Sequence, residues 1–463
     1  MSYNKWKPIR TGAVARLEAN SYIIASSWYN AVKLKNAERK VVDLFDGYHS
    51  IQDISEMTGL STDFVKACFM KLRRKKLACL LEEWNVLRYC PQCELYVMRR
   101  SECPVCGSKL KYVPLSPPCD PRPLFGLEKK FVINLLTKNA DISLSQDSFL
   151  IANTVFREQE NKYIWEIIYR GDKLYDIVFD FKDASLLKVA EEVYKEHFSK
   201  FLYECPIKLN ARSCLKGLER YVYLGDIRSL ARKTKQFIIR QRRRHGMKYP
   251  PLVKFSGGKD SMVLLKLIEE AGIPVNVVFC NMGVECPHTV NFYKNLRQKM
   301  RRAIIKFYLI NKPLFWDFFD ERGPPSIYRR WCRELKFKMI DKFSEELYGQ
   351  EQHISFDACR RYEENERRDM WLIHKNEHLR SQTIVHPLAN WTALDIWGFS
   401  YWKNLPVNPL YFLGFERIAC WLCPGNTPLQ AFMVSKVYPA LSRLFKIKLD
   451  QRGINNHSWR YQR

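Results

Sequence analysis

The spacing of apolar and polar residues predicts three short helices near the start of the chain. The amphipathic run AERKVVDLFDG stops at Gly47, and a second run opens at Ser50. Ser61 can cap a third run, STDFVKACFMKLRRKKL, whose second half is strongly basic. Together they resemble a winged helix-turn-helix, so residues 1–85 form a predicted helical domain. This domain would either dock on nucleic acid or expose a merely solvated basic face.

Alternating apolar positions farther along the chain predict strands. Three such runs, FLIANTVF, YIWEIIYR and YDIVFDF, lie between residues 130 and 200, and the helical run ASLLKVAEEVYKEHFSKFL follows them. The proline-rich stretch before them, residues 114–126, is typical of a linker. We therefore expect a small α+β module over residues 127–225.

A further helix is predicted over residues 228–248, which contain nine Lys or Arg and no acid. Its apolar anchors are Leu230, Phe237, Ile238 and Ile239. This helix either faces RNA or DNA or forms a solvated surface on the last predicted domain, residues 226–463.

Composition adds a preference for anionic partners. Lys and Arg number 76 and Asp and Glu 49, a formal net charge of +27. Such an excess favours nucleic acid, nucleotides or an anionic membrane surface. However, no stretch approaches the roughly 20 apolar residues of a spanning helix, and the first residues lack the apolar core of a signal peptide. We therefore expect a cytoplasmic protein without a membrane partner.

Two Cys-x-x-Cys pairs predict a metal site. Cys90 and Cys93 form the first pair, Cys103 and Cys106 the second, and nine residues separate the pairs. Two such turns can supply four thiolates to one tetrahedral Zn²⁺, and in a reducing cytoplasm this use of cysteine is commoner than a disulfide. The sequence therefore predicts a zinc ribbon over residues 86–113. The ribbon serves either as a structural staple or as a nucleic-acid contact through Arg99, Arg100, Lys109 and Lys111.

The run LVKFSGGKDSMVLLKLI predicts a strand, a glycine turn and a helix. The turn residues are Ser256, Gly257, Gly258, Lys259, Asp260 and Ser261. In this geometry the backbone N–H groups of both glycines and the lysine point into a concave turn, and the helix N-terminus adds partial positive charge. The turn therefore predicts a phosphate or pyrophosphate site. It differs from a Walker A loop because Asp260 follows the lysine.

With this turn the chain resembles the phosphoadenosine phosphosulfate (PAPS) reductase family, in which SGGKDS is the pyrophosphate-loop signature. Four further segments carry the resemblance across residues 250–425: VNVVFCNMGVECPHTVNFY, RRWCRELKF, DACRRYEENERR and the block from VHPLANWT to IACWLCP. The resemblance implies an α/β catalytic domain with a parallel sheet, the adenine nucleotide alpha hydrolase-like (PP-loop) fold. Strands at 252–255 and 275–280, with the helix after Asp260, form the expected βαβ unit.

The resemblance also implies further nucleotide-binding residues, because ligands of such sheets bind beyond the carboxyl ends of the strands. These residues are Asn281, Gly283, Glu285, Arg360 and Arg361. The nucleotide would be ATP, APS or PAPS, with Mg²⁺ accompanying ATP. Lys259 and the two arginines are its expected countercharges.

Cysteines of the same domain match the iron–sulfur members of the family. Cys332, Cys420 and Cys423 occupy positions that bind a [4Fe–4S] cluster there. Those members have two adjacent cysteines at the first position, whereas here Arg333 follows Cys332. This leaves four alternatives: a cluster with a fourth ligand from elsewhere in the chain, a cluster with one open iron, a zinc site, or plain thiol chemistry. The candidate fourth ligands are Cys359 and Cys286. The candidate catalytic residues are Cys332, Cys359 and Asp260.

The resemblance implies an adenine-nucleotide-binding enzyme of sulfur metabolism, either an oxidoreductase that reduces a sulfonucleotide or a sulfur transferase. Family reductases carry a nucleophilic cysteine in a C-terminal tail motif. No cysteine follows Cys423 here, so reduction by that thiol is unsupported. One alternative is ATP-dependent thiolation of tRNA or DNA through an adenylated intermediate. The other is a nucleic-acid-binding regulator that senses a nucleotide.

Overall fold

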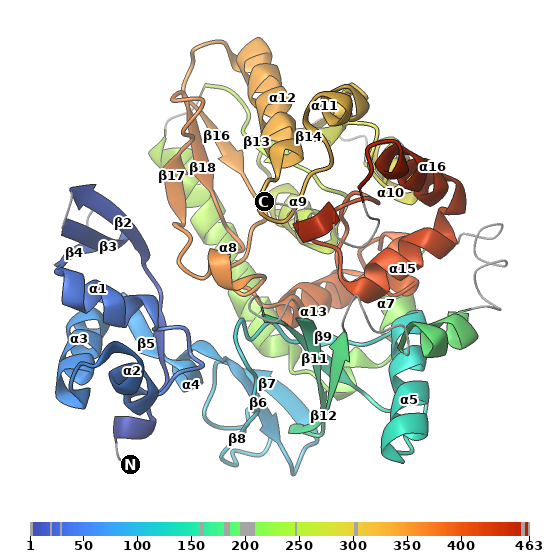
Figure 1. The fold of residues 1–463 in the computed structure, drawn as a ribbon. Coiled ribbons are helices and arrows are strands. Elements are labelled where there is room, and N and C mark those ends of the chain that lie inside the picture. The colour runs from blue at the N-terminus through green and yellow to red at the C-terminus, as the bar shows by residue number, and fades with distance from the viewer. Residues whose placement is uncertain are drawn as a thin grey trace.

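The computed structural model describes residues 3–18, 21–27, 30–157, 162–179, 186–194, 209–245, 248–300, 304–454 and 459–461. A six-stranded sheet in the order β15-β14-β13-β16-β18-β17 forms its centre (Figure 1). The strands are β13 (Leu252–Lys254), β14 (Val275–Asn281), β15 (Ile305–Asn311), β16 (His353–Phe356), β17 (Ile373–Lys375) and β18 (Gln382–Val385). Neighbouring strands are parallel except β17, which is antiparallel to β18. The predicted α/β fold with a parallel sheet is confirmed.

Helices surround this sheet, and its inner strands are therefore buried. The helices are α8 (Leu224–Arg244), α9 (Lys259–Glu270), α10 (Pro287–Lys299), α11 (Phe315–Arg322), α12 (Trp331–Tyr348), α13 (Ala393–Lys403), α14 (Pro409–Phe412), α15 (Pro428–Val437) and α16 (Pro439–Asp450). The basic helix expected over 228–248 is α8, and residues 246–247 lie outside the described residues. No described helix is long and apolar enough to cross a membrane.

The N-terminal unit contains the three predicted helices, which lie to one side of the sheet domain (Figure 1). They are α1 (Asn36–Asp43), α2 (Ile51–Thr58) and α3 (Thr62–Arg74), and Ser50 and Ser61 cap the last two as predicted. The unit also contains η1 (Tyr3–Lys5), β1 (Pro8–Arg10), β2 (Ala13–Glu18), β3 (Ser21–Ser27), β4 (Asn30–Leu34), β5 (Ala78–Leu80) and α4 (Leu81–Trp84). An ion pair of 3.4 Å from Arg10 to Asp369 joins it to the sheet domain.

The ribbon region forms a three-stranded antiparallel sheet. Its strands are β6 (Leu87–Cys90), β7 (Leu95–Met98) and β8 (Lys111–Tyr112), in the order β7-β6-β8. Backbone hydrogen bonds between Tyr96 and both Tyr221 and Tyr223 connect β7 to the segment before α8. The ribbon therefore packs directly on the segment that leads into α8.

The central module contains the three predicted strands and one helix that we did not predict. β9 (Arg122–Pro123), β10 (Ile151–Arg157), β11 (Lys162–Tyr169) and β12 (Asp172–Phe179) form a sheet. Residues 186–194 of the helical run predicted over 184–202 are helical, and the rest of that run lies outside the described residues. The unpredicted helix is α5 (Gly126–Ala140). It buries residues on nearly all sides, from Leu127 to Leu136, so its sequence lacks the apolar stripe of a surface helix.

The proline-rich stretch 114–126 is not an exposed linker, which corrects the interpretation of its composition. Cys119 is fully buried, and Leu124 packs in one apolar core with Leu413 and Phe415 of the sheet domain. Asp120 and Arg122 of this stretch form ion pairs with Arg360 and Glu416 of the sheet domain. These pairs offset the cost of burying the charged side chains. The central module and the sheet domain therefore share one core.

Short α7 (Ala211–Cys214) and the 3₁₀ turns η3 (Leu218–Arg220), η4 (Asn365–Arg367) and η5 (Trp459–Tyr461) complete the described elements.

Candidate functional site

The SGGKDS turn lies between β13 and α9, as the sequence predicts. Gly257 has φ +77°, and a Cβ there would approach Thr289 Cγ2 to 2.5 Å, so the position requires glycine. The Gly258 N–H donates to Ser256 Oγ at 3.3 Å, and the Lys259 N–H donates to the Tyr411 hydroxyl at 3.0 Å. Two of the three N–H groups expected to bind an anion thus have partners within the protein.

The charged side chains of the turn form a buried network. The Lys259 ammonium contacts Asp260 at 3.1 Å, and Arg360 donates from Nε to the same carboxylate. Burial alone would raise the pKa of Asp260, but Arg360 and Lys259 hold that pKa at about 2. Asp260 is therefore an ionised acceptor at neutral pH, which suits orientation of the two cations rather than proton donation.

The other end of the Arg360 guanidinium is held by Asp120, a residue of the proline-rich stretch. Its two terminal nitrogens donate to the two Asp120 oxygens at 2.7 and 2.9 Å. Arg360 is only 1% exposed. A planar guanidinium with a carboxylate on each side is fixed in direction as well as in charge. Asp120 therefore positions the cation that the sequence assigned to nucleotide binding.

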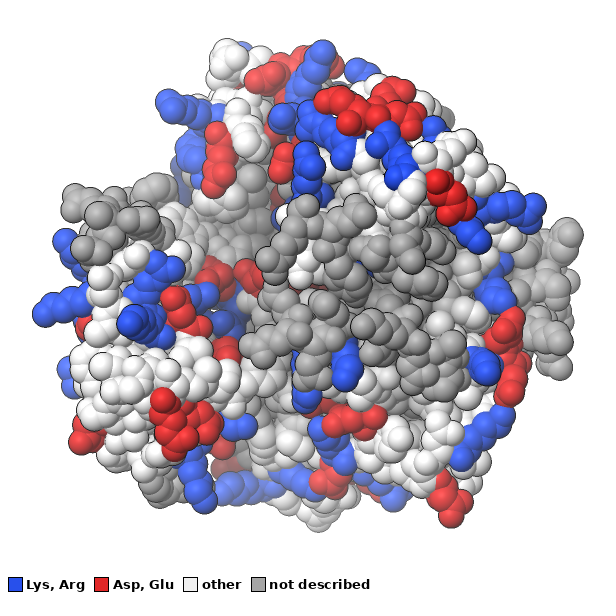
Figure 2. Space-filling model, viewed as in Figure 1, with Lys and Arg blue, Asp and Glu red and all other residues white. Residues whose placement is uncertain are grey.

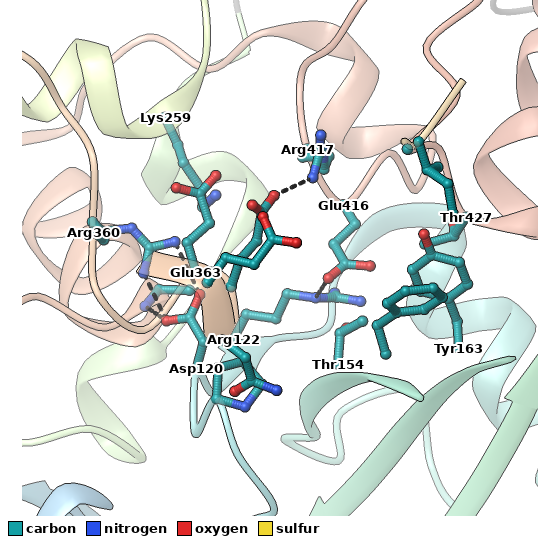
Figure 3. Close-up of a pocket in the computed structure, with 18 of the residues that line it drawn as sticks. Asp120, Arg122, Thr154, Tyr163, Lys259, Arg360, Glu363, Glu416, Arg417 and Thr427 are labelled. Carbon is teal, nitrogen blue, oxygen red and sulfur yellow. Dashed lines mark hydrogen bonds and ion pairs between the residues drawn. The ribbon is translucent and has the colours of Figure 1, made fainter. Parts of the chain in front are cut away.

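These groups form one end of a cavity of about 270 Å³ between the central module and the sheet domain (Figure 3). Its lining includes Asp120, Arg122, Thr154, Phe156, Tyr163, Lys259, Arg330, Arg360, Glu363, Glu364, Glu416, Arg417, Gly425 and Thr427. Asp120 and Arg122 come from the stretch interpreted as a linker, whereas Thr154 and Tyr163 come from β10 and β11. The central module therefore builds one wall of the candidate site.

Two arginines converge at the other end of the cavity. A Cβ on Gly425 would lie 3.3 Å from Arg330 Nη2 and 3.5 Å from Arg417 Nη2, so glycine leaves room for both guanidinium groups. Arg417 donates to Glu364 at 2.8 Å, and Arg330 forms no ion pair closer than 4 Å within the described part of the chain. Burial would raise the pKa of Glu364, but Arg417 and its neighbours lower it to about 2. This end can accept an anionic group.

The remaining predicted nucleotide residues do not line this cavity. Asn281 accepts from the Gly283 N–H at 2.9 Å, and Glu285 forms an ion pair of 2.6 Å with Lys336. Arg361 donates from Nε and Nη2 to the Met370 carbonyl, at 3.0 and 2.8 Å. The structure thus brings together Lys259, Asp260 and Arg360. The other four predicted residues, Asn281, Gly283, Glu285 and Arg361, lie outside this cavity.

Three of the four predicted cluster cysteines share one region. The thiols of Cys332, Cys420 and Cys423 interact electrostatically, and Cys286 lies beside them, 3.4 Å from the carbonyl of Ala419. Cys359 interacts instead with Asp357, Glu363, Arg367 and Lys254. Burial raises the pKa of Cys332 and Cys359 to about 11 and that of Cys286 to about 12. Thiols in such surroundings stay protonated at neutral pH unless a metal deprotonates them.

The four ribbon thiols form a compact group. Cys90, Cys93, Cys103 and Cys106 place their sulfur atoms within 4.8 Å of one another, and no other such group of three or more occurs among the residues that the structure describes. The Cys90–Cys106 sulfurs are 3.5 Å apart and the Cys93–Cys103 sulfurs 3.9 Å. Tetrahedral Zn–S bonds of about 2.3 Å require sulfur separations of about 3.8 Å. The group therefore fits a metal ion, as the spacing predicts.

The ribbon is hydrogen-bonded to the wall of the cavity. Arg99, directly after β7, donates to the two oxygens of the fully buried Asp395, at 2.9 and 2.6 Å. Asp395 completes the capping box of α13 with Thr392, and the next N–H, that of Ala393, donates to Asp120 at 2.6 Å. A continuous set of hydrogen bonds thus runs from the ribbon to the residue that holds Arg360.

Sequence reasoning missed Asp120, Arg122, Arg330 and Arg417 as cavity residues. The first two stand in PCDPRP, where a charged pair between prolines could have signalled burial beside opposite charges. Arg417 lies in the segment GFERIAC, part of the block that resembles the family, but the resemblance assigns no role to this arginine. For Arg330 the sequence offers no signal beyond its place next to Trp331 and Cys332.

The chain is similar to known proteins over part of its length. Residues 250–426 match the model of the phosphoadenosine phosphosulfate reductase domain. An adenosine 5′-phosphosulfate reductase of Geobacillus kaustophilus is 30% identical over 181 residues, which cover 37% of this chain and 73% of that protein. An uncharacterized protein of Methanocaldococcus jannaschii is 26% identical over 439 residues, covering 77% of this chain and 90% of that protein. A PAPS reductase structure from Candida auris aligns with TM-score 0.31 and 17% identity, over 42% of this chain and 94% of that one.

The parallel sheet, the SGGKDS turn and the matched domain define a PP-loop protein of sulfonucleotide metabolism. The chain belongs to the phosphoadenosine phosphosulfate reductase family. Asp120, Arg122, Thr154 and Tyr163 lie outside the matched residues 250–426. That wall of the cavity is therefore an addition to the family domain.

Proposed function

We propose that the cavity binds an adenine sulfonucleotide, APS or PAPS, as the substrate of an enzyme of sulfur metabolism. The strongest support is that cationic side chains lie at both ends of the cavity. Lys259 and Arg360 lie at the end formed by the SGGKDS turn, and Arg330 and Arg417 lie at the other end. One set of cations would bind phosphate and the other the terminal sulfate.

The position of the thiols supports the same orientation. Arg330 interacts electrostatically with Cys332, and Arg417 with Cys423. A sulfate held by these arginines would therefore lie next to the cysteine region. Sulfonucleotide reduction needs that proximity, because the sulfur atom of the nucleotide is the atom to be reduced.

Binding of the nucleotide is tested by calorimetric titration of the full chain with APS, PAPS and ATP·Mg²⁺ under anaerobic conditions. We expect the sulfonucleotides to bind and Lys259→Ala to weaken them by about 10- to 100-fold, the contribution of a hydrogen bond to a charged group. Arg330→Ala should weaken APS and PAPS more than AMP, which lacks the sulfate. Lys338→Ala, on the exposed side of α12, is the matched control and should leave all affinities unchanged. Failure of APS and PAPS to bind would refute the proposal.

A second candidate function is ATP-dependent sulfur transfer to tRNA or DNA. It is favoured by a basic surface on α8 that is larger than one nucleotide requires. In this case ATP·Mg²⁺ would bind in the same titration and APS and PAPS would not.

We further propose that Cys332, Cys420 and Cys423 bind an iron–sulfur cluster and that Cys286, rather than Cys359, is the fourth ligand. The support is placement, since Cys286 interacts with Cys423 whereas Cys359 faces Asp357 and Arg367. When bound, a cluster would supply electrons or sulfur coordination at the sulfate end of the cavity.

The cluster is tested by anaerobic purification with iron and sulfide analysis. We expect about four iron atoms per chain, loss of most of this iron in Cys420→Ala and in Cys286→Ala, and retention in Cys359→Ala. Equal loss in Cys359→Ala would contradict the ligand assignment. An iron-free protein with two zinc ions per chain would contradict the cluster itself.

A further inference from the structure

Several cations of the third predicted helix and of the ribbon form ion pairs within the protein. In α3, Lys71 pairs with Glu38 and Arg73 with Glu83. In the ribbon, Arg99 pairs with Asp395, Arg100 with Asp226 and Lys111 with Asp172. Lys and Arg side chains accordingly alternate with Asp and Glu over much of the face in Figure 2. These two elements therefore carry less free positive charge than their sequences indicate.

Helix α8 differs in this respect. Its buried side contains Ile227, Ala231 and Ile238, and its opposite side is basic. The exposed cations are Arg228, Arg232, Lys233, Arg240, Arg243 and Arg244. None of these six forms an ion pair with a carboxylate in the described part of the chain, and no acid follows Asp226 within the helix. With 21 residues the helix is about 30 Å long, so this is an extended stripe of uncompensated charge.

A groove of about 1160 Å³ beside α8 continues this charge. Its cationic lining residues are Lys266, Lys294, Lys299 and Lys403, and its amide lining residues are Asn210, Asn291, Asn295, Gln298 and Asn404. The single lining carboxylate, Glu269, pairs with Lys266 at 2.8 Å.

The stripe and the groove adjoin each other. Trp402 lies between the Arg228 guanidinium, 5.4 Å from its ring, and the Lys403 ammonium, at 3.9 Å. Lys235 of α8 and Lys403 also share Glu270, at 3.0 and 2.7 Å. We call the stripe and the groove together the α8–α10 surface.

We propose that the α8–α10 surface binds the phosphodiester backbone of a nucleic-acid strand. Lys and Arg neutralise backbone phosphates, and Asn and Gln side chains donate to phosphate and sugar oxygens, which is the composition found here. A small nucleotide would occupy only a fraction of a 30 Å stripe, whereas a strand spans it.

This surface would serve the second candidate function, but it is independent of which nucleotide the cavity binds. A narrow crevice lined by Gly258, Met262 and Tyr411 lies between the groove and the sulfonucleotide cavity. The groove is therefore on the outer side of the SGGKDS turn. A nucleic acid in the groove would therefore contact the protein without filling the sulfonucleotide cavity.

The test is fluorescence anisotropy of the full chain with a labelled RNA hairpin and with DNA of the same sequence. Three double variants are compared: R232E/K233E in the stripe, K294E/K299E in the groove, and the control K338E/K342E on the exposed side of α12. We expect the first two to lose at least tenfold in affinity and the control less than threefold, because a Debye length of about 8 Å screens distant charges. Affinity should fall about a hundredfold between 50 and 200 mM salt if four phosphates are contacted.

The RNA and DNA arms identify which nucleic acid the surface prefers, and binding of either supports the proposal. Absence of binding to both at 50 mM salt would overturn it. So would equal losses in the three double variants, or binding of poly-glutamate as tight as that of nucleic acid, which would indicate an acidic protein partner. Nucleotide titration of the same variants should be unchanged, so failure here is distinguishable from failure of the sulfonucleotide proposal.

Discussion

Replacing Asp120 by alanine should lower the free energy of unfolding by about 3 kcal/mol. Arg360 is almost fully buried, and Asp120 accepts hydrogen bonds from both of its terminal nitrogens. Removing one partner of a buried pair leaves an uncompensated charge, a change that costs about 3–5 kcal/mol. We expect the low end of this range because Asp260 still pairs with the guanidinium. Denaturant unfolding measures the change.

The same substitution should also weaken the sulfonucleotide. Without Asp120, Arg360 loses one of the two carboxylates that set its direction, and the Ala393 N–H loses its acceptor. We expect an increase of at least tenfold in the dissociation constant in the titration described above. Asp176→Ala is the matched control, because its ion pair with Lys173 is exposed and contributes about 1 kcal/mol or less. An Asp120→Ala protein as stable as the control variant would contradict the role assigned to this pair.

Replacing Cys103 by serine should abolish metal binding by the four ribbon thiols and loosen the two cysteine turns. The small core around the thiols consists of Leu95, Val97, Leu110 and the ribbon cysteines Cys90 and Cys103, whereas other ribbon residues, among them Tyr96 and Met98, pack in the main core of the protein. Structural zinc supplies about 10–16 kcal/mol of binding free energy in small zinc-binding peptides. We expect the zinc content, measured by plasma mass spectrometry, to fall from about one per chain to near zero.

The loss should extend to the cavity, because Arg99 connects the ribbon to Asp395 and the α13 cap. We expect weaker sulfonucleotide binding in Cys103→Ser and a lower thermal midpoint. Cys79→Ser serves as the control, since this half-buried cysteine lies outside the metal group and should leave zinc content and affinity unchanged. A Cys103→Ser protein that retains zinc, or one that loses it with unchanged nucleotide affinity, would contradict the respective step.

Features that depend on neighbours within a few residues were predictable from the sequence. The caps at Ser50 and Ser61, the helix after the SGGKDS turn and the two cysteine turns all follow from local backbone and side-chain chemistry. Helix α5 was missed for a related reason. It is buried on nearly all sides, so the usual apolar stripe is absent from its sequence.

The pairing of charges could not be predicted, because ion pairs join residues far apart in the chain. Arg99 is a ribbon cation by sequence, but its partner is Asp395. Arg361 has the same sequence signal as Arg360, yet it donates to the Met370 carbonyl rather than lining the cavity. Only the packing of the domains against one another decides which of these charged side chains pair with other groups of the protein.

The sequence by itself determined the parallel-sheet domain, its SGGKDS turn and the four-thiol ribbon, because a short run of residues specifies each of them. The tertiary structure decided where the cavity lies and what surrounds it. Asp120 and Arg122, in a stretch that reads as a linker, complete its wall because they find opposite charges across the module boundary. It also placed a stripe of exposed cations on α8 next to a groove lined by lysine and amide side chains.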